Sequence, residues 1–152
     1  MTFDERNERE VPVTPGTVFL GTDFSPASEN AFLLALDEAQ LRSRVLVVAH
    51  VIPTAVLLDC AISEVAPLRA ICLQKLEGLR RRAEASRVAA RIELLDGTPD
   101  VTLVEAAKRA AAEIVVLGTR GRAGVTRLMF GSVALRVVCA ATCPVVVVRA
   151  AA

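Results

Sequence analysis

Short apolar runs alternate with longer amphipathic stretches along most of this chain, and this alternation constrains the fold more than any other feature. Strand-like runs are expected at Thr17–Thr22, Val45–Val51, Arg91–Leu95, Ile114–Leu117 and Val145–Val148. Helical spacing of apolar residues lies between them, over residues 25–41, from residue 67 onward, over 100–112 and over 133–141, whereas residues 54–64 fit neither pattern. Alternation of this kind, with right-handed crossovers, predicts an α/β fold: a single-domain, doubly wound, Rossmann-like five-stranded parallel sheet with four helices.

The composition is consistent with such a sheet. The chain has 152 residues, which suits one domain, and we expect a flexible N-terminal tail over residues 1–15 ahead of a domain over 16–152. It is 53% hydrophobic but only 3% aromatic, so the core must be built mainly from aliphatic side chains, as in parallel strands that are buried on both faces.

Charge and hydropathy exclude several classes of partner. A net charge of +1 offers no large positive field for nucleic acid. The apolar runs are shorter than the about 18 residues that a membrane helix needs, and the N-terminus has no apolar signal segment. We therefore expect a soluble, cytoplasmic protein that binds neither nucleic acid nor membrane.

The four cysteines do not predict a metal site. No two of them form a Cys-x-x-Cys pair, and the chain has a single histidine, so a zinc ion would lack its usual ligands. In a reducing compartment we expect four small thiols and no metal-ligating residues.

A glycine-punctuated loop follows the fourth apolar run. It consists of Gly118-Thr119-Arg120-Gly121, nine further residues and Gly131-Ser132, and a helical stretch comes directly after it. Glycines let backbone amides approach an anion closely, and the start of a helix adds free N–H groups and the positive end of its dipole. The spacing matches neither the Walker pattern nor the dinucleotide Gly-x-Gly-x-x-Gly pattern. The loop therefore predicts a phosphate cradle of another kind.

Two features of this loop are open to more than one interpretation. The arginines at 120, 122 and 127 either contact phosphate or point to solvent. Ser132 either caps the following helix, or binds phosphate, or does both.

Asp23 follows the first apolar run and supplies the second candidate contact. Ligands of open α/β sheets bind beyond the carboxyl ends of the strands, where the winding reverses. If the first and fourth strands are neighbours, the Asp23 carboxylate faces the cradle; it would accept hydrogen bonds from ribose hydroxyls and repel phosphate. A nucleotide satisfies both ends, although Asp23 could instead serve only the turn before the helix.

No pattern in the chain predicts a catalytic centre. The lone His50 lies at a strand end with no acidic partner nearby in sequence, and it is expected to be a core residue or to support a neighbouring side chain. No nucleophile–base pair is present near the loop, so catalysis would be limited to slow phosphoryl chemistry by positioning.

These motifs together resemble the ATP-binding branch of the universal stress protein family. The segments that carry the resemblance are Gly21–Ser28, His50–Ile52, Gly118–Gly121 with Gly131–Val133, and Cys143–Val148, and it extends from about residue 17 to 149. The resemblance implies the strand order 3-2-1-4-5, which makes the first and fourth strands neighbours. It also implies a bound ATP, with Mg²⁺.

The resemblance further implies a set of ligand-binding residues. Thr22, Asp23 and Val51 would lie on the adenine and ribose side, and Leu117 and Gly118 would edge the adenosine pocket. Gly121, Gly131, Ser132 and Val133 would hold the phosphates, with Arg120 and Arg122 as loop cations beside them. The chain departs from the family at Gly21, Leu117 and Arg120, where members often carry Pro, Met and His.

The implied function is that of a nucleotide-responsive stress-response module that binds ATP and signals to a protein partner that the sequence does not name. A slow ATPase and a nucleotide-independent structural dimer are the alternatives. The apolar run Val145–Val148 predicts a sheet edge, and an unblocked edge favours pairing with a second copy of the chain. We therefore expect a homodimer through this final strand.

Overall fold

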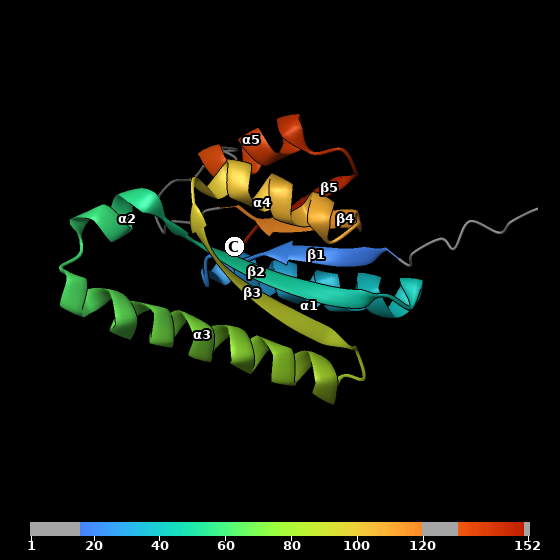
Figure 1. Cartoon of the computed structure of the whole chain (residues 1–152). Helices are drawn as coiled ribbons and strands as arrows, with labels where there is room; N and C mark the ends of the chain where they lie inside the picture. Colours follow the sequence, from blue (N-terminus) through green and yellow to red (C-terminus); the bar gives the residue numbers. More distant parts are fainter. Residues whose placement is uncertain (1–15, 120–130, 151–152) are drawn as a thin grey trace, which may run out of the picture.

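Five strands form one parallel sheet in the computed structural model, which describes residues 16–119 and 131–150. The strands are β1 (Thr17–Gly21), β2 (Val45–Pro53), β3 (Ala90–Gly97), β4 (Ala112–Gly118) and β5 (Val145–Val148). Their order across the sheet is β3-β2-β1-β4-β5 (Figure 1). The predicted doubly wound sheet and its strand order are therefore confirmed, and the tail predicted over residues 1–15 lies outside the described residues.

Helices cover both faces of this sheet. They are α1 (Pro26–Arg42), α2 (Thr54–Asp59), α3 (Ile62–Ala85), α4 (Pro99–Arg109) and α5 (Ser132–Ala140). Helices α1 and α3 pack on one face, and α4 and α5 on the other (Figure 1). Within the described ranges, no helix combines the length and apolarity that a membrane span requires.

The prediction of four helices was wrong, because the described residues contain five. The unassigned segment 54–64 forms the short helix α2 and the first residues of α3, which begins at Ile62, five residues before Pro67. The Glu64 carboxylate accepts the backbone N–H of Ala61 at 2.9 Å and so caps the start of α3. Proline has no N–H, so Pro67 removes only one helical hydrogen bond, the one that the Ser63 carbonyl would accept. Ser63 is exposed, so water can donate to this carbonyl instead.

The core consists of two apolar layers, one on each face of the central strands. Val18, Leu20 and Val116 pack with α1 and α3, whereas Phe19 and Val115 pack with α4 and α5. Successive strand side chains point to opposite faces, so continuous apolar runs are required where both faces are covered.

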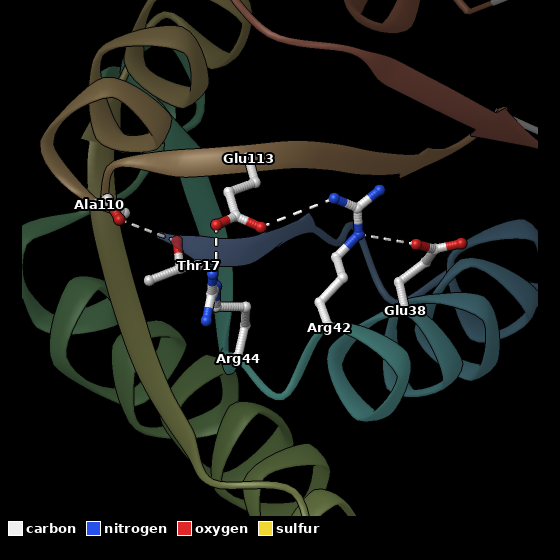
Figure 2. A network of polar contacts seen from close by, with 6 residues as sticks. All are labelled: Thr17, Glu38, Arg42, Arg44, Ala110 and Glu113. Atoms are coloured by element: carbon white, nitrogen blue, oxygen red, sulfur yellow. Dashed lines mark hydrogen bonds and ion pairs between the residues drawn. The ribbon is translucent and has the colours of Figure 1, made fainter. Parts of the chain in front are cut away.

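A polar network joins the elements at the amino ends of β1 and β4 (Figure 2). Arg44 Nε donates to Glu113 Oε1 at 2.8 Å, and Arg42 Nη1 lies 3.6 Å from Glu113 Oε2. Thr17 Oγ1 donates to the Ala110 carbonyl at 2.9 Å. These contacts fix the end of the sheet opposite to the carboxyl ends of the strands, where the candidate site lies.

Candidate functional site

A cleft of about 350 Å³ opens at the carboxyl ends of β1, β2 and β4. Eight of the residues predicted to bind a ligand line it, namely Thr22, Asp23, Val51, Leu117, Gly118, Gly131, Ser132 and Val133. The sheet register explains this, since Gly21 pairs with Ala49 on one side and with Leu117 on the other. The other predicted residues, Arg120, Gly121 and Arg122, lie outside the described residues.

The Asp23 carboxylate is oriented by the turn that leads into α1. Its Oδ1 accepts hydrogen bonds from Ser28 Oγ at 2.6 Å and from the Ser25 backbone N–H at 3.0 Å. Asp23 is exposed at the cleft, whereas Ser28 is buried. The aspartate therefore serves the turn, as one interpretation of the sequence expected, and also lies on the wall of the cleft.

Gly118 is required by a close approach between β4 and the start of α1. A Cβ atom at this position would lie 2.5 Å from the Ser28 backbone nitrogen and 2.6 Å from the Ala27 carbonyl carbon. Real Cβ atoms do not approach backbone so closely, so only glycine fits without a shift of the backbone. This contact brings the end of β4 against the turn that carries Asp23.

The first turn of α5 also borders the cleft. Gly131 is the N-cap of this helix, and Ser132 is its first residue, so the interpretation of Ser132 as the cap was wrong. Gly131 takes the cap because its backbone, with φ −52° and ψ 147°, is extended, while its carbonyl accepts the first helical hydrogen bond, from Leu135 at 3.1 Å. The initial N–H groups of a helix have no partner within it, and here they lie at the cleft with the positive end of the dipole.

The side of the cleft near β2 and α4 is mainly apolar. Sequence reasoning named Val51 and Leu117 here but missed several other lining residues, namely Pro53, Val56, Pro99 and Leu103. Pro53 ends β2 and Pro99 begins α4 just after β3, so the rule that ligands bind beyond strand ends could have identified both. Val56 and Leu103 gave no such signal because they lie within helices.

His50 also lines the cleft, although sequence reasoning assigned it only a supporting or core position. Its Nδ1 lies 2.7 Å from the Thr22 carbonyl oxygen, and its ring centroid lies 4.6 Å from that of Phe24. A carbonyl oxygen can only accept a hydrogen bond, so Nδ1 carries a proton and its N–H donates to the Thr22 carbonyl. Thr22 is therefore bonded to β2 twice. Its carbonyl accepts from His50 Nδ1, and its N–H donates to the Ala49 carbonyl oxygen at 2.9 Å.

The described part of the chain, residues 16–119 and 131–150, contains no cluster of three His, Cys, Asp or Glu side chains that could hold a metal ion. Within those ranges the chemistry of the cleft is therefore that of hydrogen bonding, apolar contact and a helix dipole. One part of its wall bears a carboxylate, another is a helix N-terminus, and the side near β2 and α4 is mainly apolar.

The comparison with known families agrees with this geometry. Residues 16–149 match the Universal stress protein family. The chain belongs to this family. The resemblance to this family, inferred from the glycine loop and the first strand, is therefore confirmed.

Curated universal stress proteins are similar over most of the chain. One from Mycolicibacterium smegmatis is 38% identical over 143 residues, which cover 87% of this chain and 45% of that protein. One from Thermus aquaticus, in the QAH/OAS sulfhydrylase 3′ region, is 35% identical over 88% of this chain and 98% of its own length. The chain thus spans about half the length of the mycobacterial relatives that it matches.

Solved structures share the fold. Hypothetical protein MJ0577 superposes with a TM-score of 0.79 at 21% identity, covering 92% of this chain and 99% of that one. A universal stress protein from Archaeoglobus fulgidus, solved in complex with dAMP, gives a TM-score of 0.68 at 22% identity over 88% of this chain and 97% of its own. Another universal stress protein, solved in complex with cAMP, gives 0.67 at 26% identity over 90% of this chain and 98% of its own.

Proposed function

We propose that this universal stress protein binds ATP in the cleft between β1, β4 and α5 and acts as a nucleotide-responsive module. The observation that carries the proposal is that one cleft combines the Asp23 carboxylate with the N-terminus of α5 and an apolar side wall. The complexes of two family members with dAMP and cAMP support an adenine nucleotide as the ligand.

Each part of the nucleotide has a matching wall in this proposal. The adenine base lies against Val51, Leu103 and Leu117, where burial of its faces is favourable. Asp23 accepts hydrogen bonds from the ribose hydroxyls. The phosphates approach Gly131, Ser132 and Val133 at the start of α5, where N–H groups and the dipole favour negative charge.

Mg²⁺ enters this proposal with the nucleotide. Because the described residues offer no cluster of metal-ligating side chains, the ion would be held mainly by phosphate oxygens and water, as Mg²⁺ commonly is in nucleotide complexes. Its expected contribution is to reduce repulsion between the phosphates.

Binding of this kind changes the protein through mass action. A ligand that binds only the folded state stabilises it in proportion to the logarithm of its concentration over Kd. The described walls of the cleft come from seven elements, namely β1, α1, β2, α2, α4, β4 and α5. ATP would therefore stabilise their relative positions, and a partner protein could recognise that state.

Calorimetric titration tests the proposal. ATP with Mg²⁺ at millimolar concentration is expected to give saturable heat with wild-type protein, and Asp23→Ala is expected to weaken binding. Lys108→Ala, on the outer surface of α4, provides the matched control and should bind as the wild type does. A flat trace with folded, nucleotide-free wild-type protein would remove the proposal.

We also propose that the chain forms a homodimer through β5. The strand is at one edge of the sheet, and its four valines are all only half-buried. An unpaired edge with apolar side chains is a favourable surface for antiparallel pairing with a second copy.

A further inference from the structure

His50 contacts the residues on both sides of Asp23. Its Nδ1–H donates to the carbonyl of Thr22, the residue before the aspartate, at 2.7 Å. Its ring lies against the ring of Phe24, the residue after it, with centroids 4.6 Å apart and planes inclined by 40°. The single histidine of the chain therefore holds the short segment that presents the Asp23 carboxylate to the cleft.

The segment needs such support because its backbone is not in a relaxed conformation. Phe24 has a φ of +62°, in the left-handed region that is costly for a bulky residue. Its N–H donates to Thr22 Oγ1 at 3.0 Å, which closes a tight turn around Asp23. Lys75 of α3 covers the Phe24 ring, with Nζ 5.1 Å from the ring centroid. Phe24 is thus in contact with both His50 and α3.

The hydrogen bond from His50 also continues the sheet beyond its last backbone pair. The β1–β2 pairing ends at Gly21 and Ala49, and one residue later the Thr22 carbonyl bonds to a side chain of β2 rather than to its backbone. Without that donor, the partly buried carbonyl would lose its partner. The peptide before Asp23 would then be held only on its other side, where the Asp23 N–H donates to Ser28 Oγ at 3.2 Å.

From this geometry we propose that His50 is a positioning residue that sets the ribose specificity of the cleft by holding Asp23 in place. The inference rests on the proposed binding of ATP, in which Asp23 accepts from ribose hydroxyls. His50 acts through the peptide that it holds, so its removal should reduce discrimination for the ribose more than it reduces contacts to the base or the phosphates.

Three substitutions separate the parts of the imidazole. His50→Asn keeps an N–H donor close to the position of Nδ1, and His50→Gln places its amide near Nε2 instead. His50→Phe keeps a ring against Phe24 but removes both nitrogens. If the hydrogen bond to Thr22 positions Asp23, His50→Asn retains the discrimination for the ribose, whereas the other two variants reduce it.

The measured quantity is the ratio of Kd values for 2′,3′-dideoxy-ATP and ATP, obtained by calorimetry for each variant. His50→Phe and His50→Gln are expected to lower this ratio roughly three- to tenfold, the range for one hydrogen bond, while His50→Asn stays near the wild type. In an Asp23→Ala background, where the ratio approaches one, His50→Phe is expected to change it no further.

Other outcomes would overturn the inference. It fails if His50→Phe keeps the wild-type ratio, if His50→Gln keeps the ratio while His50→Asn loses it, or if the effect of His50→Phe persists without Asp23. Failure of wild-type protein to bind either nucleotide would instead reject the proposed function, so the two failures are distinguishable.

A spectroscopic measurement on unmodified protein does not depend on whether the variants fold. Because the chain has one histidine, a tag-free ¹⁵N-labelled sample gives one set of imidazole resonances. In the neutral imidazole, Nδ1 is expected to carry the proton. A neutral ring protonated only at Nε2 would exclude the bond to Thr22 and overturn the inference.

Discussion

At the scale of single residues, two glycines have opposite consequences for stability. Gly118 ends β4, where an added Cβ would meet the backbone of Ser28 and Ala27. Gly78 lies in the middle of α3, where an added Cβ would have nothing within 4 Å. Glycine is therefore necessary at the first position, whereas at the second it only lowers the stability of the helix.

We expect Gly118→Ala to destabilise the fold by about 1–3 kcal/mol, because backbone atoms must move to make room. Gly78→Ala should stabilise it by about 0.5–1 kcal/mol, since alanine favours the helix and meets no neighbour. Urea denaturation of the two variants beside the wild type measures both free energies of unfolding. Equal effects of the same sign would contradict the close approach of β4 to α1.

Glu113 is one of the carboxylates for which a lowered pKa predicts a dependence of stability on pH, and Glu29 and Glu77 are others. The hydrogen bond from Arg44 lowers the pKa of the Glu113 carboxyl below the ordinary value of 4.5, although partial burial opposes the change. A carboxylate with a lowered pKa in the folded state stabilises the protein above the unfolded pKa. This stabilisation is lost as the pH falls from about 4.5 through the lower folded value.

Glu113→Gln should therefore reduce the loss of stability below pH 4.5, as measured by chemical denaturation over a pH series. Arg44→Met should have a similar effect, since it removes the main cause of the lowered pKa. The double variant is expected to match Glu113→Gln alone. A profile for Glu113→Gln that still follows the wild type would show that other carboxylates account for the acid sensitivity.

At the scale of elements, the start of α5 determines how the cleft can receive an anion. Gly131 caps the helix with extended backbone angles, and within the described residues no side chain caps it by a hydrogen bond. Because those angles are available to any residue, the glycine is not required by its backbone conformation. What a larger residue would change is the space in front of the first amides of α5.

Gly131→Val is therefore expected to leave the fold unchanged and to weaken ATP binding roughly ten- to a hundredfold, as one or two charge-assisted hydrogen bonds are lost. Circular dichroism checks the fold, and calorimetry measures the affinity. Val138→Ala, on the exposed side of the same helix, is the control and should bind ATP as the wild type does. Unchanged affinity in Gly131→Val would mean that phosphate does not approach this helix.

At the scale of the whole molecule, β5 decides whether the sheet ends or continues into a second copy. The carbonyl of Pro144 accepts from Val115 of β4, and that of Val148 accepts from Thr119, the residue after β4, so both carbonyls point into the sheet. Backbone direction alternates along a strand, and Val145 and Val147 consequently turn their N–H and C=O groups to the open edge.

Val147→Pro should make the protein monomeric, because it removes an outward donor without removing a bond to β4, and proline is tolerated at an edge. Light scattering coupled to gel filtration measures the mass across micromolar concentrations. Wild-type protein is expected at twice the mass of the 16.1 kDa chain. A wild-type mass of a single chain would contradict the proposed dimer.

The sequence by itself determined the class of fold and the chemistry of the cleft. Continuous aliphatic runs such as Val45–Ala49 are typical of parallel strands that are covered on both faces, so their alternation with helices predicts the architecture. Gly118 and Asp23 each follow such a run, and residues beyond strand ends meet at one edge of the sheet. Local pattern was enough there because strand direction alone places these residues.

Only the tertiary structure decided which side chains complete the cleft and how they are held. Val56 and Leu103 line it from two helices, and His50 joins β2 to the turn around Asp23; no local spacing encodes these contacts. The fifth helix was missed for a related reason, since α2 has no buried residue and so leaves no periodic apolar face in the sequence. Contacts between distant segments depend on how elements pack, and packing is a property of the whole chain rather than of any window within it.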